Sequence, residues 1–522
     1  MRHAILIILQ RHFAISRGGS PYPPRGNGRF CRCAAGTETR RAASSVVGIS
    51  GAVVLGSVLV LAVGCVSVPQ QRAAGEAAAS VHQRYLDRQA SESGSRHELP
   101  DLTDPSHLPD YLAYAALNNP GLEAAFSRWK AALERVPQVR SLPDPRFNYR
   151  YFIREVETRV GPQRQAFGVA QAFPWFGKLE LAGGVAAEAA RAARAQYEVK
   201  KLAVFHRVKD AYYEYHYLAR AIGVIRDNRD LVIHLESVAR TRYKAAAIGH
   251  HDVIRAQVEL GKLDDRLRSL EELRDPLTAR LNAALGRDVS LPLPWPKEAP
   301  YEPVAVTDDQ MLAWLRDASP ELEALDHEVA GSRKAIDLAK KDYYPDVTLG
   351  FEYVDTAGAV RPGVGDSGTD PVVATMSVNI PVWAEKYAAG VREAEARHWA
   401  ALKDKADREH TLSGEVKMVL YRFRDAARKI NLYRDTLVPK ATESIKATEA
   451  AFRTGKAGFT DLVDAQRVLL EFALAQERAL ADHAQRLAEL ERLIGRTIPR
   501  APAGPAADKP ETKNRSSEGD KP

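Results

Sequence analysis

The chain has 522 residues, of which 45% are hydrophobic and 27% charged, an ordinary composition for a folded protein. Its formal net charge is +7, but residues 1–64 hold eight Arg, no Lys and one Glu and so carry +7 by themselves. The remaining chain is close to neutral, which leaves no basic field for nucleic-acid binding.

The first 64 residues have the character of a targeting segment. An Arg-rich region ends at Arg40-Arg41, and residues 46–64 then form a run of 19 without a charge. The run closes at Leu61-Ala62-Val63-Gly64-Cys65, which resembles a bacterial lipobox. We therefore predict a signal peptide over residues 1–64 and a lipid-bearing Cys65 as the first mature residue. The alternative is an uncleaved transmembrane anchor, because 19 apolar residues can span a bilayer.

Cysteine usage and the two ends of the mature chain narrow the possibilities further. The three cysteines are Cys31, Cys33 and Cys65, so the mature chain would keep only the anchor thiol. This excludes a disulfide framework and a cysteine-based metal or redox site. We predict a polar, lipid-anchored tether over residues 65–107 and a disordered tail over residues 499–522, which are rich in Pro, Ala, Lys and Glu.

Two stretches 209 residues apart repeat one another. Residues 249–257 and 458–466 share the pattern Gly-x-x-Asp, two aliphatic residues, any residue, Ala-Gln. Upstream, Pro120, Leu122, Glu123, Ala124 and Pro145 return, at an offset of 200, as Pro320, Leu322, Glu323, Ala324 and Pro345. We predict an internal duplication, with a first structural repeat over residues 108–300 and a second over residues 301–498.

Each predicted repeat contains a very long helix and a returning helix. Residues 179–247 and 384–438 contain no Pro and are rich in Ala, Glu, Arg, Lys and Leu. A helix of about 70 residues would extend roughly 105 Å, so it has to pack beside other helices in a coiled-coil-like layer. Residues 252–285 and 461–494 would run back after turns at Gly249, Gly455 and Gly458, with kinks or breaks at Pro276 and Pro439.

Each predicted repeat also contains a pair of strands. Residues 346–353 and 372–380 alternate between apolar and polar side chains, and residues 147–154 do the same. Residues 165–173 alternate poorly and are predicted as a strand from their position alone. Strands of this kind suit a membrane barrel with Trp175 and Trp383 at a membrane interface, although a soluble hairpin with one wet face has the same pattern. Four strands cannot close a barrel, so strands in a membrane would have to be pooled among several copies.

Taken together, these features resemble the TolC-type outer-membrane efflux proteins over about residues 108–498. The most specific stretch is residues 452–467 with its partner from Tyr243, and residues 173–179 further resemble the heavy-metal branch, the CusC and CzcC kind. The resemblance implies an α+β membrane protein that forms a homotrimer. Four strands from each chain would make a 12-stranded outer-membrane β-barrel, which a long periplasmic α-helical barrel would continue. The resemblance likewise implies an outer-membrane and periplasmic location in a Gram-negative bacterium.

The resemblance also implies a function and partners. The chain would be the outer-membrane channel of a tripartite efflux system, a passive duct for heavy-metal cations that docks on a periplasmic adaptor and an inner-membrane pump of the RND type. Drug efflux and type I protein secretion are the alternatives, and a coiled-coil scaffold lipoprotein is a third. The motifs of nucleophilic, phosphate-binding and zinc enzymes are not found in the sequence, so we predict neither an enzyme nor a cofactor.

The resemblance assigns roles to residues at the two helical turns. The family's docking-tip motif, small-Gly-hydrophobic, maps onto Thr454-Gly455-Lys456 and Ala245-Ala246-Ala247, with Gly458 and Gly249 beside them. Its acidic aperture maps onto Asp461 and Asp464, and the first-repeat counterparts are Asp252 and Arg255. Its aperture-closing Tyr and gating Arg map onto Phe452 and Ala457, so the closed-state contacts have to differ here.

The sequence His250-His251-Asp252 contains residues of metal-ligating type, but adjacent histidines point apart on a helix and no third ligand follows at a useful spacing. We therefore expect a solvated tip at this place and no metal site.

Overall fold

The structure is a computed structural model that describes residues 102, 107–297, 301, 303–304 and 306–500. All of them belong to one contact unit, Gln71–Pro522. The predicted signal peptide, Cys65, and most of the predicted tether and tail lie outside the described residues, so these predictions stay untested.

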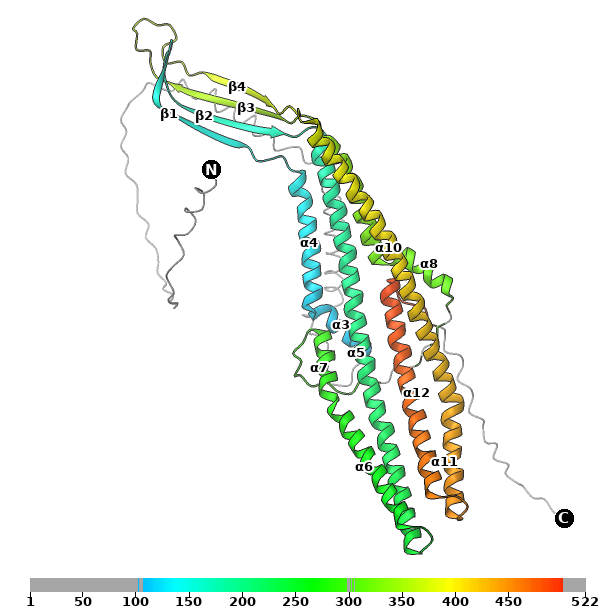
Figure 1. The fold of residues 1–522 in the computed structure, drawn as a ribbon. Helices are drawn as coiled ribbons and strands as arrows, with labels where there is room; N and C mark the ends of the chain where they lie inside the picture. Colours follow the sequence, from blue (N-terminus) through cyan, green and yellow to red (C-terminus); the bar gives the residue numbers. More distant parts are fainter. Residues whose placement is uncertain (1–101, 103–106, 298–300, 302, 305, 501–522) are drawn as a thin grey trace, which may run out of the picture. The chain divides into compact units, whose positions relative to one another are not determined.

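One order of elements occurs twice along the described chain: two helices, two strands, one long helical element and a returning helical segment (Figure 1). The first set is α3 (Leu108–Asn118), α4 (Pro120–Arg140), β1 (Arg146–Thr158), β2 (Gly161–Phe173), α5 (Lys178–Lys244), α6 (His250–Glu272) and α7 (Arg274–Leu285). The second set is α8 (Asp308–Ala318), α9 (Pro320–Lys341), β3 (Val347–Thr356), β4 (Val372–Val378), α10 (Ala384–Leu432), η1 (Tyr433–Leu437), α11 (Val438–Arg453) and α12 (Phe459–Ile494). The predicted strands and long helices are confirmed, while the duplication and the domain boundaries stay predictions.

The four strands form one antiparallel sheet in the order β1-β2-β3-β4. The two hairpins join through β2 and β3, where Phe167 pairs with Tyr353 and Val169 with Phe351. Because side chains alternate along a strand, this register gathers the large apolar residues on one face of the sheet. That face is exposed in the single chain, with Phe147 at 67% and Met376 at 69%. The outer edges of β1 and β4 have no strand partner among the described residues.

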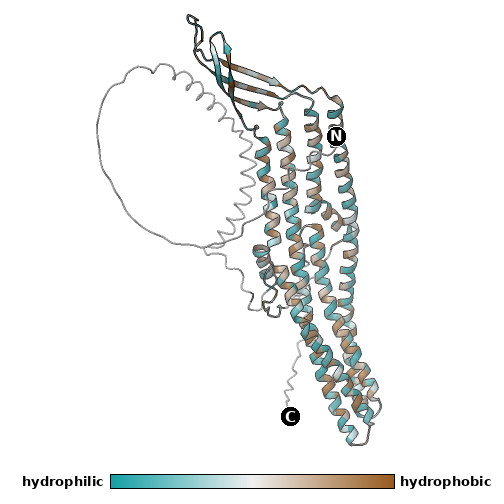
Figure 2. Ribbon diagram, turned by 60° about the vertical axis from the view of Figure 1, so that its left-hand side comes forward, coloured by the Kyte–Doolittle hydropathy of each residue, from teal (hydrophilic) through white to brown (hydrophobic). Residues whose placement is uncertain are grey.

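The long helices run from the sheet to the opposite end of the bundle. Helix α5 has 67 residues, about 100 Å at 1.5 Å per residue, and four residues separate it from the end of β2. The second long element consists of α10, η1 and α11 in direct succession. Figure 2 shows hydrophilic and hydrophobic residues mixed along these helices. Within the described ranges, no helix combines the length and the apolar character needed to cross a bilayer.

The two predicted proline breaks differ in form. Pro276 lies in the first turn of α7, directly after the break that separates α6 from α7. Pro439 is the second residue of α11, and the five-residue π-helical segment η1 precedes it without a gap. A proline cannot donate its backbone hydrogen bond and clashes with the carbonyl four residues earlier, and a wider π turn accommodates both defects. The second long helix therefore bends at Pro439 and does not end.

The bundle has separate apolar clusters along its length. Val208, Tyr215 and Leu281 belong to a cluster formed by α3, α5 and α7. A second cluster, formed by α8, α9, α10 and α12, includes Leu412 and Leu490. A third cluster lies near the helical turns and combines residues of α5, α6, α11 and α12. Separate clusters are expected for long helices that each bury only one apolar stripe of side chains and share no common core.

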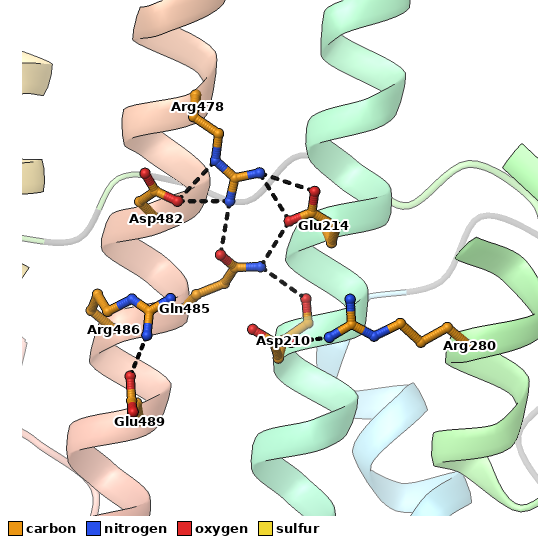
Figure 3. Close-up of polar contacts among 8 residues, drawn as sticks. All are labelled: Asp210, Glu214, Arg280, Arg478, Asp482, Gln485, Arg486 and Glu489. Carbon is orange, nitrogen blue, oxygen red and sulfur yellow. Dashed lines mark hydrogen bonds and ion pairs between the residues drawn. The ribbon is translucent and has the colours of Figure 1, made fainter. Parts of the chain in front are cut away.

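Helices α5 and α12 meet through a polar seam, shown in Figure 3. Arg478 donates to both carboxylate oxygens of Glu214, at 2.9 and 3.0 Å, and Gln485 donates to Glu214 at 3.1 Å. Further along, Lys209 Nζ lies 2.6 Å from Glu491. A buried hydrogen bond between Gln466 and Asn228 extends the seam toward the turns. These pairs fit only one axial alignment of the two helices, so they select its register.

A buried carboxylate joins α5 to α9 nearer the sheet. Glu188 is hydrogen-bonded to Lys334 at 2.7 Å and to His327 at 2.9 Å, and Arg191 lies 2.7 Å away. Burial by itself would raise the pKa of Glu188, but the hydrogen bonds from Lys334 and His327 and the charges of Arg191 and Lys334 together outweigh burial and hold the pKa below its usual value. The carboxylate is therefore ionised at neutral pH and ties the two helices together.

The histidine on α12 makes the stability of the bundle depend on pH. His483 is 3% exposed and stacks against Phe423, with ring centroids 4.3 Å apart. Burial, with a smaller contribution from Arg500, lowers the pKa of His483 to about 4. Between pH 6.5 and 4 the unfolded chain binds a proton that the folded chain excludes, so stability falls as pH falls. The loss should reach about 3 kcal/mol.

The check is the pH dependence of thermal unfolding, followed by circular dichroism in detergent. His483→Phe should flatten the profile between pH 6.5 and 4, because the ring can no longer be protonated. His410→Phe is the matched control, since His410 is exposed on α10 and should leave the profile as in the wild type. Equal profiles for the wild type and His483→Phe would contradict the assignment.

Candidate functional site: the helical tips

Two tight turns close the helical hairpins at the end of the bundle far from the sheet (Figure 1). In the turn between α5 and α6, Ala246 N–H donates to the carbonyl of Tyr243 at 2.8 Å. In the turn between α11 and α12, Gly455 N–H donates to the carbonyl of Phe452 at 3.1 Å. In each turn the next backbone N–H donates to the carbonyl of the residue that precedes this acceptor. This pair of hydrogen bonds is the Schellman motif at a helix C-terminus.

The two turns share a backbone shape but differ in the residue that adopts it. Gly455 has φ +77°, and Ala246, at the equivalent place, has φ +55°. The first turn has no glycine at this place, yet its backbone keeps the left-handed conformation. An alanine in this region costs roughly 1 kcal/mol or more relative to glycine, so the first tip holds local strain.

The predicted aperture residues Asp461 and Asp464 both lie on an exposed side of α12, while Leu462 and Val463 between them are buried. Asp461 accepts a hydrogen bond from the backbone N–H of Gly458 at 2.9 Å and so helps to cap α12. Asp464 is 61% exposed, 3.4 Å from Arg467. The two carboxylates share a helix face, as their spacing predicted. Asp461 also caps the helix, a role that the sequence analysis did not predict.

The first-repeat counterpart is less exposed. The Asp252 side chain is 13% exposed and lies 3.3 Å from Nε2 of His251. The ring of His250 packs at a tilt against Tyr243, with ring centroids 5.1 Å apart. The two adjacent histidines therefore have different neighbours. No group of three or more His, Cys, Asp or Glu side chains suited to one metal ion occurs in the described part of the chain.

The two hairpins are joined just above the turns by contacts that sequence reasoning missed. Arg467 of α12 bonds both carboxylate oxygens of Glu259 on α6, one of them at 3.2 Å, and Glu259 is 8% exposed. The hydrogen bond from Arg467 holds the pKa of Glu259 below its usual value. Nearer the turn, Arg255 of α6 bonds the hydroxyl of Thr460. These contacts form an ion-pair lock between the hairpins, which we define as Glu259, Arg467, Arg255 and Thr460.

Phe452, at the place of the family's aperture-closing Tyr, makes apolar contacts. It is buried against Phe459, at 5.7 Å between ring centroids, and the guanidinium of Arg242 lies 4.9 Å above its ring. A cation over an aromatic face needs no hydroxyl. The tip therefore combines a cation–π contact with the ion-pair lock.

The two tryptophans predicted for a membrane interface flank the junction of sheet and helices. Trp175 stacks on Tyr344 at 5.4 Å, and its backbone N–H donates to Asp346 at 2.8 Å. Lys178, in the first turn of α5, lies 3.2 Å from the same carboxylate. Trp383, directly before α10, is exposed. Asp346 therefore fixes the start of α5 to the start of β3, a role that only the structure discloses.

The chain is similar to outer-membrane efflux proteins in sequence and in fold. Residues 313–496 match the family described as outer membrane efflux protein. Protein CyaE of Bordetella pertussis is 26% identical over 237 residues, which are 43% of this chain and 49% of CyaE. The match thus spans about half the length of that curated relative.

Solved structures extend the likeness of fold to most of the chain. The outer membrane protein VceC of Vibrio cholerae aligns with a TM-score of 0.62 at 17% identity, covering 75% of this chain and 97% of VceC. CusC, in work on folding and transmembrane channel formation, aligns with a TM-score of 0.64 at 12% identity, covering 77% and 95%. The match to the outer membrane efflux protein family thus covers residues 313–496, and the likeness to the solved structures concerns the fold.

The strain at the first tip predicts opposite effects of two substitutions. Ala246→Gly should relieve the left-handed alanine, partly offset by the greater entropy of a glycine in the unfolded chain. Gly455→Ala should introduce the same strain at the second tip, at roughly 1 kcal/mol. Hydrogen–deuterium exchange of peptides across each turn should become slower in the first variant and about fivefold faster in the second. Faster exchange at the first tip in Ala246→Gly would contradict the assignment.

Proposed function

We propose that this chain is the outer-membrane channel of a tripartite efflux system and acts as a passive exit duct. The observation that carries the proposal is the four-stranded sheet with one large apolar face, attached to helices that extend about 100 Å away from it. An apolar sheet face suits lipid, and the helices are long enough to cross a periplasmic space. The match of residues 313–496 to the outer membrane efflux protein family supports the same conclusion.

The assembly that satisfies this sheet is a homotrimer. Open strand edges are not tolerated in the hydrocarbon core of a bilayer, so β1 and β4 have to pair with strands of other copies. Three chains with four strands each give a closed 12-stranded barrel. The helical part also presents large exposed side chains on α10, Trp399, Met418 and Tyr421, which suit packing against a neighbouring protomer.

Two further assignments place the trimer in the cell envelope of a Gram-negative bacterium. Cys65 is proposed as the lipidated mature N-terminus, because it follows Gly64 at the end of the uncharged run. The tips are proposed as the docking surface for a periplasmic adaptor that links the duct to an inner-membrane pump of the RND type. The exposed tip residues Thr454, Gly455 and Lys456, and the first-repeat turn from Ala245 to Gly249, would make these contacts.

The cargo is proposed to be a heavy-metal cation. Support comes from residues 173–179, which resemble the heavy-metal branch, and from Asp461 and Asp464, which threefold symmetry would gather into six carboxylates around the axis. A crowded acidic ring attracts cations. Drug efflux and type I protein secretion are the other cargo classes, since the pump selects what enters the duct.

The primary test is the assembly and conductance of the full-length protein in detergent and planar bilayers. Native mass measurement should give three chains, because only a closed barrel satisfies both sheet edges. The trimer should conduct ions, and deletion of the gene should raise sensitivity to heavy-metal cations. A stable monomer with full β content would contradict the barrel, and sensitivity to drugs alone would reassign the cargo.

The aperture is tested by Asp461→Asn/Asp464→Asn. Asparagine keeps an oxygen that can accept the Gly458 N–H bond, so the cap of α12 survives and only the charge is lost. The double variant should show weaker cation selectivity and weaker block by divalent or trivalent cations. Asp308→Asn/Asp309→Asn is the matched control, since it removes two acidic residues from the first turn of α8. Unchanged selectivity and block in the aperture variant would rule out the acidic ring.

A further inference from the structure

The polar face of the sheet carries an ion pair that spans an intervening strand. Arg150 Nη2, on β1, lies 2.9 Å from Glu352 Oε1, on β3. The two strands are not neighbours, because β2 lies between them. Across β2, Arg150 pairs with Ala166, and Glu352 pairs with Gly168. The two charged residues are therefore diagonal partners, two strand spacings or roughly 10 Å apart in the direction of the ladder.

The contact is possible because β2 has small residues on this face. Ala166, Gly168, Ala170 and Ala172 alternate along β2 and point to the same side. A Cβ atom added at Gly168 would lie 3.8 Å from the Cβ of Glu352, and a longer side chain there would stand between the two charged groups. Small side chains on β2 thus leave an open path along which the long arginine reaches β3.

The small residues on this face of β2 are largely shielded from solvent. Ala166 is 1% exposed and Gly168 is buried, although most side chains on the sheet are exposed in the single chain. Gly350, on β3, is buried on the same face. The ion pair spans β2 beside these buried small residues, with the Arg150 side chain 63% exposed and the Glu352 side chain 21% exposed.

This pair supplies two of the three charged side chains on the regularly paired part of the polar face, which ends at the register shifts after Tyr151 and before Gln165. In this part the other polar residues are Arg146, Asn148 and a set of neutral hydroxyl side chains, namely Thr348, Thr375 and Ser377. Glu352 is the one carboxylate of this set, and it neutralises Arg150. Arg146 has no ion-pair partner in the described part of the chain.

We propose that Arg150 and Glu352 determine the ion selectivity of the barrel segment. The inference rests on the proposed trimeric channel, in which the polar face lines the lumen and three such pairs surround the axis. With Glu352 in place, the regularly paired part of the lumen wall keeps only the charge of Arg146 from each chain. Without Glu352, three additional arginine charges would face the path and repel cationic cargo.

The experiment measures reversal potentials of full-length trimers in planar bilayers under a potassium chloride gradient. It uses the Asp461→Asn/Asp464→Asn background, so that acidic groups at the tips do not dominate the selectivity. Glu352→Gln should lower the ratio of potassium to chloride permeability by about twofold or more, and Arg150→Gln should raise it. The double variant Arg150→Gln/Glu352→Gln and the exchanged pair Arg150→Glu/Glu352→Arg should both return close to the background value.

The opposite signs and the recovery distinguish a charge effect from a loss of structure. Glu385→Gln is the matched control, because it removes the carboxylate of an Arg–Glu pair on α10, outside the sheet. Unchanged ratios in conducting trimers, or shifts of the same sign in both single variants, would overturn the inference while leaving the channel intact. A wild-type trimer that does not conduct would overturn the proposed function as well.

Discussion

The contact between α5 and α12 joins the first half of the chain to the second, and the rest of the helical structure depends on it. Glu214, Arg478 and Gln485 form its centre, and Lys209 with Glu491 and Asn228 with Gln466 extend it in both directions. Apolar side chains tolerate sliding between two long helices, since many alignments bury similar area. Charged and amide groups at reduced exposure do not, because a shifted partner leaves one group buried without its hydrogen bond.

Register at the seam has a consequence at the tips. A helix shifted by one turn moves by about 5.4 Å along its axis. The lock between Arg467 and Glu259 lies on the same helix, α12, as Arg478. An alignment that satisfies Arg478 therefore also sets the height at which Arg467 meets α6. The polar seam in the middle of the bundle and the tip contacts are thus parts of one alignment, with the strained turn at Ala246 closing the neighbouring hairpin.

The sequence alone predicted the helices and strands but not the contacts between them. Long Pro-free segments predicted α5 and α10, and alternation predicted β1, β3 and β4, because these patterns are local. Strand β2 alternated poorly since its polar-face positions are Ala and Gly, residues that look apolar or neutral in any pattern. The partners Glu214 and Arg478 are 264 residues apart, and nothing local pairs them. The aperture assignment came from resemblance, because a single chain does not reveal which helix face would line a lumen.

The small residues of β2 illustrate why a weak pattern can carry information. A strand that lined a polar lumen with its own side chains would show a clear alternation of polar and apolar residues. Its polar side chains would also stand between the side chains of the two neighbouring strands. Strand β2 instead presents Ala166 and Gly168, and the polar surface above it is supplied by Arg150 and Glu352 from the adjacent strands. The polarity of this face is therefore a property of three strands together. A carboxylate on β3 compensates an arginine on β1, so the charge of the wall is decided across the junction of the two hairpins, and neither hairpin would have it alone.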